Sequence, residues 1–462
     1  MKHVGIIGGG VAGLTAAWEL SRLGFQVDLF EEQNELGGLA AAFDFSGTRI
    51  ERYYHFICRG DRTLIETCGR LGIGHRLRWR STRTGLFFAG EQRDFGTPLD
   101  LVRFAPLSWG EKMRFGRHIL RARRMRDWQE LQHVPARDWL IGGAGRRVYE
   151  LVWDPLLRIK FGHYHDRLPA AWMWHRIHRV ASSRRTAFHR EELGYLEGGT
   201  QTLIDAFAGQ ARAAGARIHL GSRATAIRAE GGRCRGLEVR TAGPATNGPA
   251  GARFLACDYV VSAVPLPVYR ELIPRDDPEV LRGLDGIPFL GVVCMILRLR
   301  RSVSPYFWLN VNDERIAFNG VIEYTNLNRP AGAGETILYI PFYLTSDSPR
   351  FTRKDEELLE EYAAALAILD PGFTRDCIAD HRVFRSRYAQ PAFQVGANQQ
   401  VPPQETPWDG CYLVESTQLY PADRIISGML RLAQGAVARI AQREGVRLPP
   451  QVSVWHEGEI PA

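Results

Sequence analysis

Several common features are scarce or missing in this chain, and each absence narrows what it can be. No run of about 18 or more apolar residues occurs, so we expect no transmembrane helix. The first apolar run begins within three residues, so we expect no signal peptide. The seven cysteines are scattered without CxxC spacing, which fits free thiols rather than a zinc site or a disulfide framework. These absences predict a cytoplasmic protein that holds no metal.

Lysine is also scarce, since it occurs only at positions 2, 112, 160 and 354, and most of the net charge of +8 is therefore carried by arginine. Basic residues cluster at 112–126, with Phe115, Ile119, Leu120 and Met125 between them. This pattern fits a solvated helix face, a surface that meets an acidic partner, or a basic amphipathic helix that lies peripherally on an anionic membrane. No aromatic-interleaved nucleic-acid module is visible, so we expect no nucleic-acid partner.

The first 38 residues carry the strongest positive signal. An apolar run at 3–7 predicts a buried strand, the glycine pattern GxGxxG follows at 8–13, and apolar residues at helical spacing then extend to position 23. A second predicted strand at 27–30 ends at Glu31. This order of strand, glycine turn, helix, strand and acid is the one that a dinucleotide requires.

Each residue of this motif has a physical task. Gly8 permits the tight turn, Gly10 lets the backbone approach a pyrophosphate, and Gly13 lets the helix pack close to the strand. The helix N-terminus offers unpaired N–H groups and a partial positive charge to the phosphates. Glu31 can accept hydrogen bonds from ribose hydroxyls, and its charge would repel a 2′-phosphate.

A second glycine pair follows in the segment Asn34-Glu35-Leu36-Gly37-Gly38-Leu39-Ala40. With the motif above, this segment resembles the superfamily of flavin-containing amine oxidases, protoporphyrinogen oxidases and phytoene desaturases. A basic residue usually follows the glycine pair in that superfamily, and this chain has Leu39 instead. Further resemblance comes from 194–200, 224–227, 258–265 and the C-terminal stretch 410–428, where Glu415 takes the place of the usual Gly-Asp.

The resemblance implies an α/β fold in which a Rossmann-type FAD-binding domain is interleaved with a mixed α+β substrate domain. We expect the FAD-binding domain at 1–75, 190–270 and 405–445, the substrate domain at 76–189 and 271–404, and a tail at 446–462. Residues 98–189 are predicted to be mostly helical and 286–345 mostly strands. We expect a strand pair over 45–56, a turn at 142–145, a hairpin loop at 243–251 and a helix from about Met429 to Arg443.

The resemblance also implies non-covalent FAD, because nothing matches the cysteine motif that tethers flavin in monoamine oxidases. The residues expected to bind FAD are Gly8, Gly10, Val11, Ala12, Gly13, Glu31, Glu32, Gly37, Gly38, Leu39, Ala40, Ala224, Pro265, Glu415, Arg424, Ile425 and Ile426. No second strand–GxGxxG–helix unit is visible, which disfavours a reductase that uses NAD(P)H. The expected electron acceptor is therefore O2 or a quinone.

The expected catalytic residues are Tyr54, His55 and Tyr388, in segments that lie beside the flavin in the superfamily. His55 has two possible functional roles, as a general base or as a group that holds a flavin oxygen. A buried histidine with a structural role explains the sequence equally well. Residues 323–326 are a further candidate for the wall of the substrate cavity. The arginines in 286–300 leave no lysine on that strand, which favours dehydrogenation at carbon over the lysine-assisted C–N oxidation of the amine oxidases.

Two functions from different classes remain open. One is an FAD-dependent oxidoreductase that dehydrogenates a small organic substrate at a C–C or C–N bond by hydride transfer to flavin N5. The other resembles UDP-galactopyranose mutase, which acts on a nucleotide sugar without net redox change. A non-catalytic flavin-binding protein is a minor third possibility.

Overall fold

A five-stranded parallel sheet holds the N-terminal motif. The computed structural model describes residues 1–182, 190–241, 253–274, 278–329 and 334–449. The sheet has the order β19 (Cys411–Leu413), β13 (Tyr259–Ser262), β1 (His3–Ile7), β2 (Gln26–Phe30) and β9 (Arg217–His219). Because neighbouring strands are parallel, their carboxyl ends share one edge, where α/β proteins bind ligands.

Alternating side chains of β1 serve two cores. Val4 and Ile6 pack against α1 (Val11–Arg22), α9 (Gln201–Ala213) and α13 (Ile426–Arg443), together with α2 (Arg62–Arg70). Ile7 faces the opposite side, where the antiparallel sheet of β10 (Ser222–Glu230), β11 (Arg233–Thr241) and β12 (Arg253–Ala256) packs, flanked by α10 (Leu266–Leu272) and α11 (Pro278–Leu284). A strand that is buried on both faces explains the unbroken apolar run.

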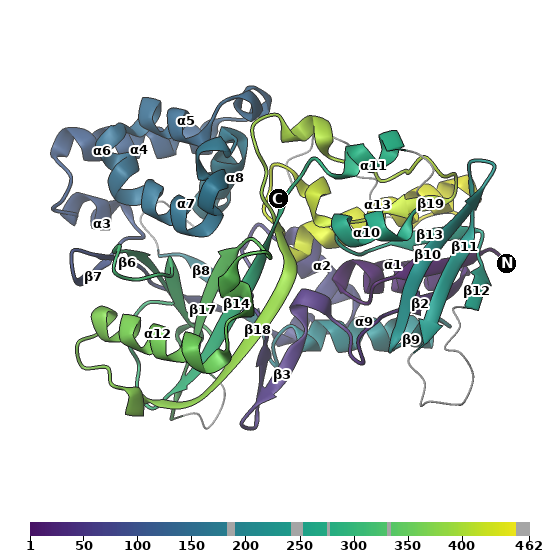
Figure 1. Ribbon diagram of the computed structural model, residues 1–462, viewed down its shortest axis with the longest axis horizontal. Helices are drawn as coiled ribbons and strands as arrows, with labels where there is room; N and C mark the ends of the chain where they lie inside the picture. Colours follow the sequence, from purple (N-terminus) through teal and green to yellow (C-terminus); the bar gives the residue numbers. More distant parts are fainter. Residues whose placement is uncertain (183–189, 242–252, 275–277, 330–333, 450–462) are drawn as a thin grey trace.

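A second, seven-stranded sheet lies beside this unit (Figure 1). Its order is β18 (Ile378–Pro391), β14 (Phe289–Leu299), β17 (Thr336–Leu344), β16 (Gly320–Glu323), β15 (Trp308–Asn312), β6 (Thr84–Phe88) and β7 (Glu91–Asp94). Helix α12 (Asp355–Leu369) covers one face through Leu358, Tyr362 and Leu366. The other face joins a core that includes Trp172 and Trp174 from the helical lobe.

The helical lobe sits above the second sheet in Figure 1 and is built from 98–182. It contains α3 (Pro98–Arg103), α4 (Trp109–Arg124), α5 (Ala136–Ala144), α6 (Arg146–Val148), α7 (Asp154–Phe161) and α8 (Ala170–Ser182). Two strand pairs complete the fold, β3 (Ala42–Phe45) with β4 (Thr48–Glu51) and β5 (Leu77–Ser81) with β8 (Glu192–Leu196). The expected α/β fold with its helical and strand-rich regions is confirmed.

Three local predictions need correction. Gly142 and Gly143 lie inside α5, which continues to Ala144, rather than in a turn. Glycine stands at 143 because a Cβ there would lie 1.9 Å from the His118 ring of α4. Helix α13 begins at Ile426, three residues before the predicted start. The strand pair expected over 45–56 ends at Glu51. The loop expected at 243–251 and positions 450–462 of the expected tail lie outside the described residues.

Candidate functional site

A cavity of about 1280 Å³ connects the glycine turn to the space between the second sheet and the helical lobe. Its walls include the carboxyl edge of the parallel sheet, the segment 52–56, the ends of β17 and β18, and parts of α4, α7 and α8. It therefore has a groove at the parallel sheet and a chamber beneath the helical lobe. This continuity allows a dinucleotide and a second molecule to meet in one enclosed space.

The glycine turn has the geometry that its sequence predicts. Gly8 adopts a φ of +99°, which favours glycine. A Cβ on Gly13 would lie 1.9 Å from the carbonyl oxygen of Gly8, so only glycine lets α1 pack this closely. A Cβ on Gly10, in contrast, would meet no described atom within 4 Å, and Gly10 lines the cavity. A ligand can therefore approach the backbone at Gly10.

The start of α1 is a ready anion site. Gly10 is its N-cap, no acidic residue stands in its first turn, and within the described chain no side chain caps it. The first N–H groups of the helix are thus left for a ligand, and the helix dipole adds positive potential there. A pyrophosphate fits this terminus.

Glu31 holds the turn in place from the end of β2. One carboxylate oxygen accepts a hydrogen bond from Gly9 N at 2.7 Å and the other from Gln33 N at 2.9 Å. Burial raises the pKa of Glu31, although these backbone bonds favour its charged form. Each oxygen keeps a lone pair, so the carboxylate can still accept hydrogen bonds from a ribose.

The second glycine pair lies against the first. Gly37 N donates to Gly9 O at 2.9 Å, and Gly37 and Gly38 have φ values of +117° and +54°. These left-handed conformations explain why two glycines stand here. Leu39 and Ala40 follow and also line the cavity.

Glu415 gives an independent test of fit for the cofactor. Oε1 accepts a hydrogen bond from Thr417 N at 2.9 Å and another from the Thr417 hydroxyl, while buried Oε2 has no partner among the described residues. Burial raises the pKa of Glu415 to about 8. An unpaired carboxyl oxygen at the cavity wall suits a hydroxyl group, such as one of the ribityl chain of FAD, because a hydroxyl can both donate and accept a hydrogen bond.

The remaining residues predicted to bind FAD also border the cavity. Glu32, Val11 and Ala12 do so near the glycine turn, Ala224 on β10, Pro265 before α10, and Arg424, Ile425 and Ile426 at the start of α13. Gly13 alone among the predicted residues lies behind the wall, in keeping with its packing role. The donors, the acceptors and the open backbone therefore fit FAD.

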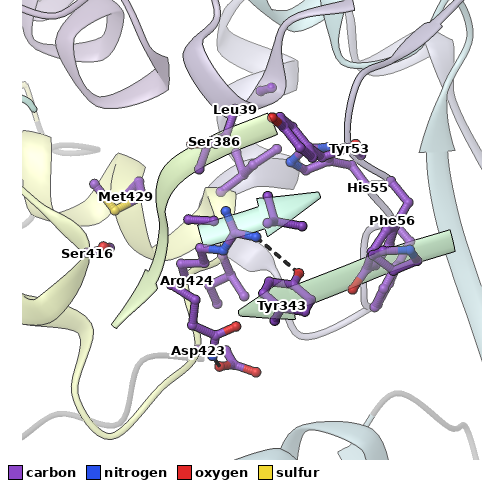
Figure 2. Close-up of a pocket in the computed structure, with 18 of the residues that line it drawn as sticks. Leu39, Tyr53, His55, Phe56, Tyr343, Ser386, Ser416, Asp423, Arg424 and Met429 are labelled. Carbon is purple, nitrogen blue, oxygen red and sulfur yellow. Dashed lines mark hydrogen bonds between the residues drawn. The ribbon is translucent and has the colours of Figure 1, made fainter. Parts of the chain in front are cut away.

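All three predicted catalytic residues border the cavity. The Tyr54 ring meets Trp308 edge to face at 5.2 Å, and Tyr388 at the end of β18 meets Phe289 in the same way at 6.1 Å. His55 Nδ1 lies 2.7 Å from Tyr53 O, a pure acceptor, so Nδ1 carries the proton. Figure 2 shows His55 beside Tyr53 and Phe56.

The environment of His55 decides its protonation. Burial and the nearby Arg424 guanidinium lower the pKa of His55 to about 4. The ring is therefore neutral at physiological pH, and Nε2, which forms no hydrogen bond within the described residues, is an acceptor. A pKa this low makes His55 a weak general base at neutral pH and favours a role in hydrogen bonding.

Residues 323–326 do not border the cavity as expected. Glu323 is buried elsewhere, where its carboxylate accepts from Val303 N and Ser304 N at 3.2 and 2.9 Å. Burial raises the pKa of Glu323 to about 7. The segment has a structural role because it closes the turn that precedes β15.

The sequence prediction missed a charged cluster in the chamber. Lys160 on α7, Arg176 on α8, Tyr343 on β17 and Asp423 before α13 line the same cavity as Arg424. Figure 2 shows Arg424 donating to the Tyr343 hydroxyl, at 3.2 Å, with Asp423 next to it. No local pattern in the sequence marks these residues. The scarcity of lysine is a signal for Lys160 alone, because each lysine in a chain with so few is a candidate functional residue.

A family match agrees with this geometry. The model of the flavin-containing amine oxidoreductases matches residues 11–420, so the chain belongs to this family. Two curated relatives are a 15-cis-phytoene desaturase from an Oncidium hybrid cultivar, 24% identical over 63% of this chain and 52% of that protein, and a 4,4′-diaponeurosporene oxygenase from Staphylococcus aureus, 26% identical over 64% of each. The chain thus spans less than two thirds of the length of these relatives.

Solved structures show the same fold. A putative protoporphyrinogen oxidase from Exiguobacterium sp. 255-15 has a TM-score of 0.74 at 19% identity, covering 96% of this chain and 99% of that one. A reduced UDP-galactopyranose mutase has a TM-score of 0.72 at 14% identity, covering 100% and 99%. The family match confirms the flavin cofactor expected from the sequence, and its non-covalent attachment stays a prediction.

Proposed function

We propose that the chain is an FAD-dependent oxidoreductase that dehydrogenates a small organic substrate at a C–C or C–N bond. The observation that carries this proposal is the continuity of the FAD groove with an aromatic chamber in one cavity. Bound FAD would supply a hydride acceptor, and the substrate would lose a hydride and a proton to form a double bond. The phytoene desaturases and the putative protoporphyrinogen oxidase among the similar proteins support a carbon-centred reaction.

The residues of the chamber would orient the substrate and exclude water. Tyr54, Phe56, Phe307 and Trp308 form connected edge-to-face ring contacts and make a largely apolar wall. His55 Nε2 can accept a hydrogen bond from a polar hydrogen placed against this wall. Burial, with Tyr343 beside it, raises the pKa of Tyr54 far above its usual range, so its hydroxyl stays a proton donor.

The test follows the flavin directly. The purified protein should show flavin absorbance, and anaerobic addition of a true substrate should bleach it; phytoene, protoporphyrinogen and putrescine are the first probes. Re-admitted air should restore the colour with peroxide release if O2 is the acceptor, whereas a requirement for added quinone would identify a dehydrogenase. A protein that neither contains nor takes up FAD would refute the proposal.

The alternative is chemistry of the mutase kind, on a nucleotide sugar. The excess of cations in the chamber favours it, because a diphosphate would meet Lys160, Arg176 and Arg424 there. Such an enzyme would convert UDP-galactopyranose only after dithionite reduction, and its flavin would end in the same redox state. Turnover of that substrate would replace the oxidoreductase proposal.

We also propose that the helical lobe lies peripherally on an anionic membrane. Trp109, Met113 and Leu120 form one face of α4 and are 64%, 69% and 48% exposed, and Leu99 and Val102 on α3 are also exposed. The arginines of 112–126 surround this face, and Leu120 also lines the cavity. Apolar side chains within a basic surround match an anionic lipid surface. No helix among the described residues is both long and apolar enough to cross a bilayer.

Vesicle co-sedimentation tests this surface. The protein should bind vesicles that contain phosphatidylglycerol, lose binding at high salt, and bind pure phosphatidylcholine weakly. Replacing Trp109 and Met113 together by serine should abolish binding, while Phe254→Ser, at an apolar position on β12 that is 53% exposed, should not. Equal binding by the two variants, or none by the unaltered protein, would refute a lipid-facing surface.

A further inference from the structure

The charged cluster in the chamber contains a carboxylate that already accepts three hydrogen bonds. Asp423 Oδ1 accepts from Trp172 Nε1 at 3.0 Å and Gln390 Nε2 at 2.7 Å, and Oδ2 accepts from Arg176 at 2.7 Å. The neighbouring Lys160 and Arg176 hold the pKa of Asp423 far below its usual range, despite its burial. Asp423 is therefore charged and engaged with Arg176.

Lys160 makes no direct contact of this kind, although its charge attracts Asp423 from beyond ion-pair distance. Its Nζ lies 5.1 Å from the ring of Tyr343, 5.3 Å from that of Phe161 and 5.4 Å from that of Trp172. Its accessible part faces the cavity, and it forms no hydrogen bond or ion pair with any residue that the structure describes. Rings compensate a cation only in part, so all three ammonium donors remain available.

Arg424 adds a second cation with free donors. Within the described residues it donates one hydrogen bond, to the Tyr343 hydroxyl at 3.2 Å, and the Tyr343 ring also lies 5.1 Å from Lys160 Nζ. The charge of Asp423 acts on both Lys160 and Arg176, and Arg424 adds a further positive charge that acts on Lys160. Uncompensated charge in a low-dielectric enclosure is costly, so this end of the cavity favours an incoming anion.

The surroundings of the two cations define the rest of the ligand. Tyr343, Phe307, Trp308 and Leu156 line this part of the cavity and supply mainly aromatic and aliphatic surface. The phosphates of FAD have their own site at α1, in the groove. The phosphates of the cofactor therefore do not account for Lys160, and Arg424, which is also predicted to border FAD, lines the same cavity with donors left for a second ligand.

We infer that Lys160 and Arg424 bind an oxyanion, a carboxylate or a phosphate, carried by an otherwise apolar substrate. This inference rests on the proposed function in one respect: the chamber is taken to be the substrate site. The ammonium and guanidinium groups would fix one end of the molecule by charge-assisted hydrogen bonds, and the aromatic wall would hold its hydrocarbon part beside His55. Substrates that lack the anionic group would bind without a fixed position relative to His55.

Binding measurements on the FAD-loaded protein test the inference without turnover. The probes are octanoate, octyl phosphate and octanol, which share one alkyl chain, and binding is followed by calorimetry and by tryptophan fluorescence, because Trp172 contacts both Lys160 and Arg176. We expect at least one anionic probe to bind about tenfold tighter than octanol, which corresponds to about 1.4 kcal/mol. A preference for octyl phosphate over octanoate would assign a phosphate.

Matched lysine variants make the test specific. Lys160→Met should remove the preference for the anion while leaving octanol binding unchanged, whereas Lys354→Met, at the exposed N-cap of α12, should leave the preference intact. Flavin absorbance and the thermal midpoint confirm that each variant is folded and loaded. The inference fails if octanol binds as tightly as both anions, if no probe binds, or if Lys160→Met keeps the preference.

The same samples separate this inference from the proposed function. Persistent anion preference in a protein whose flavin no substrate can bleach would leave the anion site standing and remove the dehydrogenation. Bleaching by a substrate in a protein without anion preference would remove the anion site and leave the dehydrogenation standing.

Discussion

The two ends of the cavity are built by different means. The groove depends on neighbouring residues: Gly8 to Gly13 make one turn, and Gly37 joins it through a backbone hydrogen bond. The chamber depends on long-range contacts, as between Trp172 and Asp423, which are 251 positions apart. The first end is fixed by local backbone geometry, and the second by the compensation of charge among distant elements.

This contrast predicts how each end of the cavity responds to amino-acid substitution. The groove needs particular φ angles and the absence of a Cβ, so one added methyl group can destroy it. The chamber needs a balance of charge, so its failures should be graded and dependent on pH. Four substitutions examine this difference, beginning with the largest expected effect.

Gly13→Val should abolish flavin binding and severely destabilise the protein. The added side chain would begin 1.9 Å from Gly8 O, and neither α1 nor β1 can move without disturbing the parallel sheet. The ratio of flavin to protein absorbance and the thermal midpoint report the two losses. The control is Gly209→Ala in α9, where a Cβ meets no described atom within 4 Å and helix propensity predicts a gain of about 0.5–1 kcal/mol. Flavin binding retained by Gly13→Val would contradict the close packing.

Asp423→Asn should destabilise the protein by about 3 kcal/mol, because it leaves Lys160, Arg176 and Arg424 without a buried counter-charge. The thermal midpoint should fall, and added octanoate should restore part of it by supplying an anion. Asp376→Asn, an exposed aspartate in the turn after α12, serves as the control. Equal midpoints for the two variants would show that the cluster is not under charge strain.

Lys160→Met should stabilise the ligand-free protein, most clearly below about pH 7. Burial lowers the pKa of Lys160 from 10.5 to about 7, so between these values the unfolded chain binds more protons than the folded one. Stability of the unaltered protein therefore gains from this group as pH rises from about 7 to 10.5, and methionine removes that gain. Thermal midpoints measured from pH 5.5 to 10 should differ most at the acid end and converge at the alkaline end. A difference that stays constant with pH would contradict the lowered pKa.

Tyr343→Phe should have the smallest effect, a loss of about 1 kcal/mol. It removes the acceptor of one Arg424 hydrogen bond and keeps the ring that faces Lys160. Tyr388→Phe, whose hydroxyl has no recorded hydrogen bond in the described structure, should leave the thermal midpoint unchanged within about 0.5 kcal/mol. A larger loss for Tyr388→Phe would reveal a role for that hydroxyl in folding.

Sequence reasoning was strongest where the signal is local. The turn at 8–13, the acid at Glu31 and the glycine pair at 37–38 were predicted with their positions, because φ angles and steric contacts depend on neighbouring residues. It was weakest for Gly143, whose partner His118 belongs to another helix. It also did not assign Lys160 to the candidate site, because a helix in the middle of the chain gives no sign of the cavity that it faces.

The amino-acid sequence by itself determined the parallel sheet, the anion-binding start of α1 and the flavin family, because strand patterns and glycine turns follow from short stretches of chain. Only the tertiary structure decided that Lys160, Arg176, Tyr343 and Asp423 meet beside Arg424, and that Glu415 leaves one oxygen unpaired at the cavity. The physical reason is that charge compensation and desolvation depend on distance in space. The separation of two residues along the chain does not reveal their distance in space.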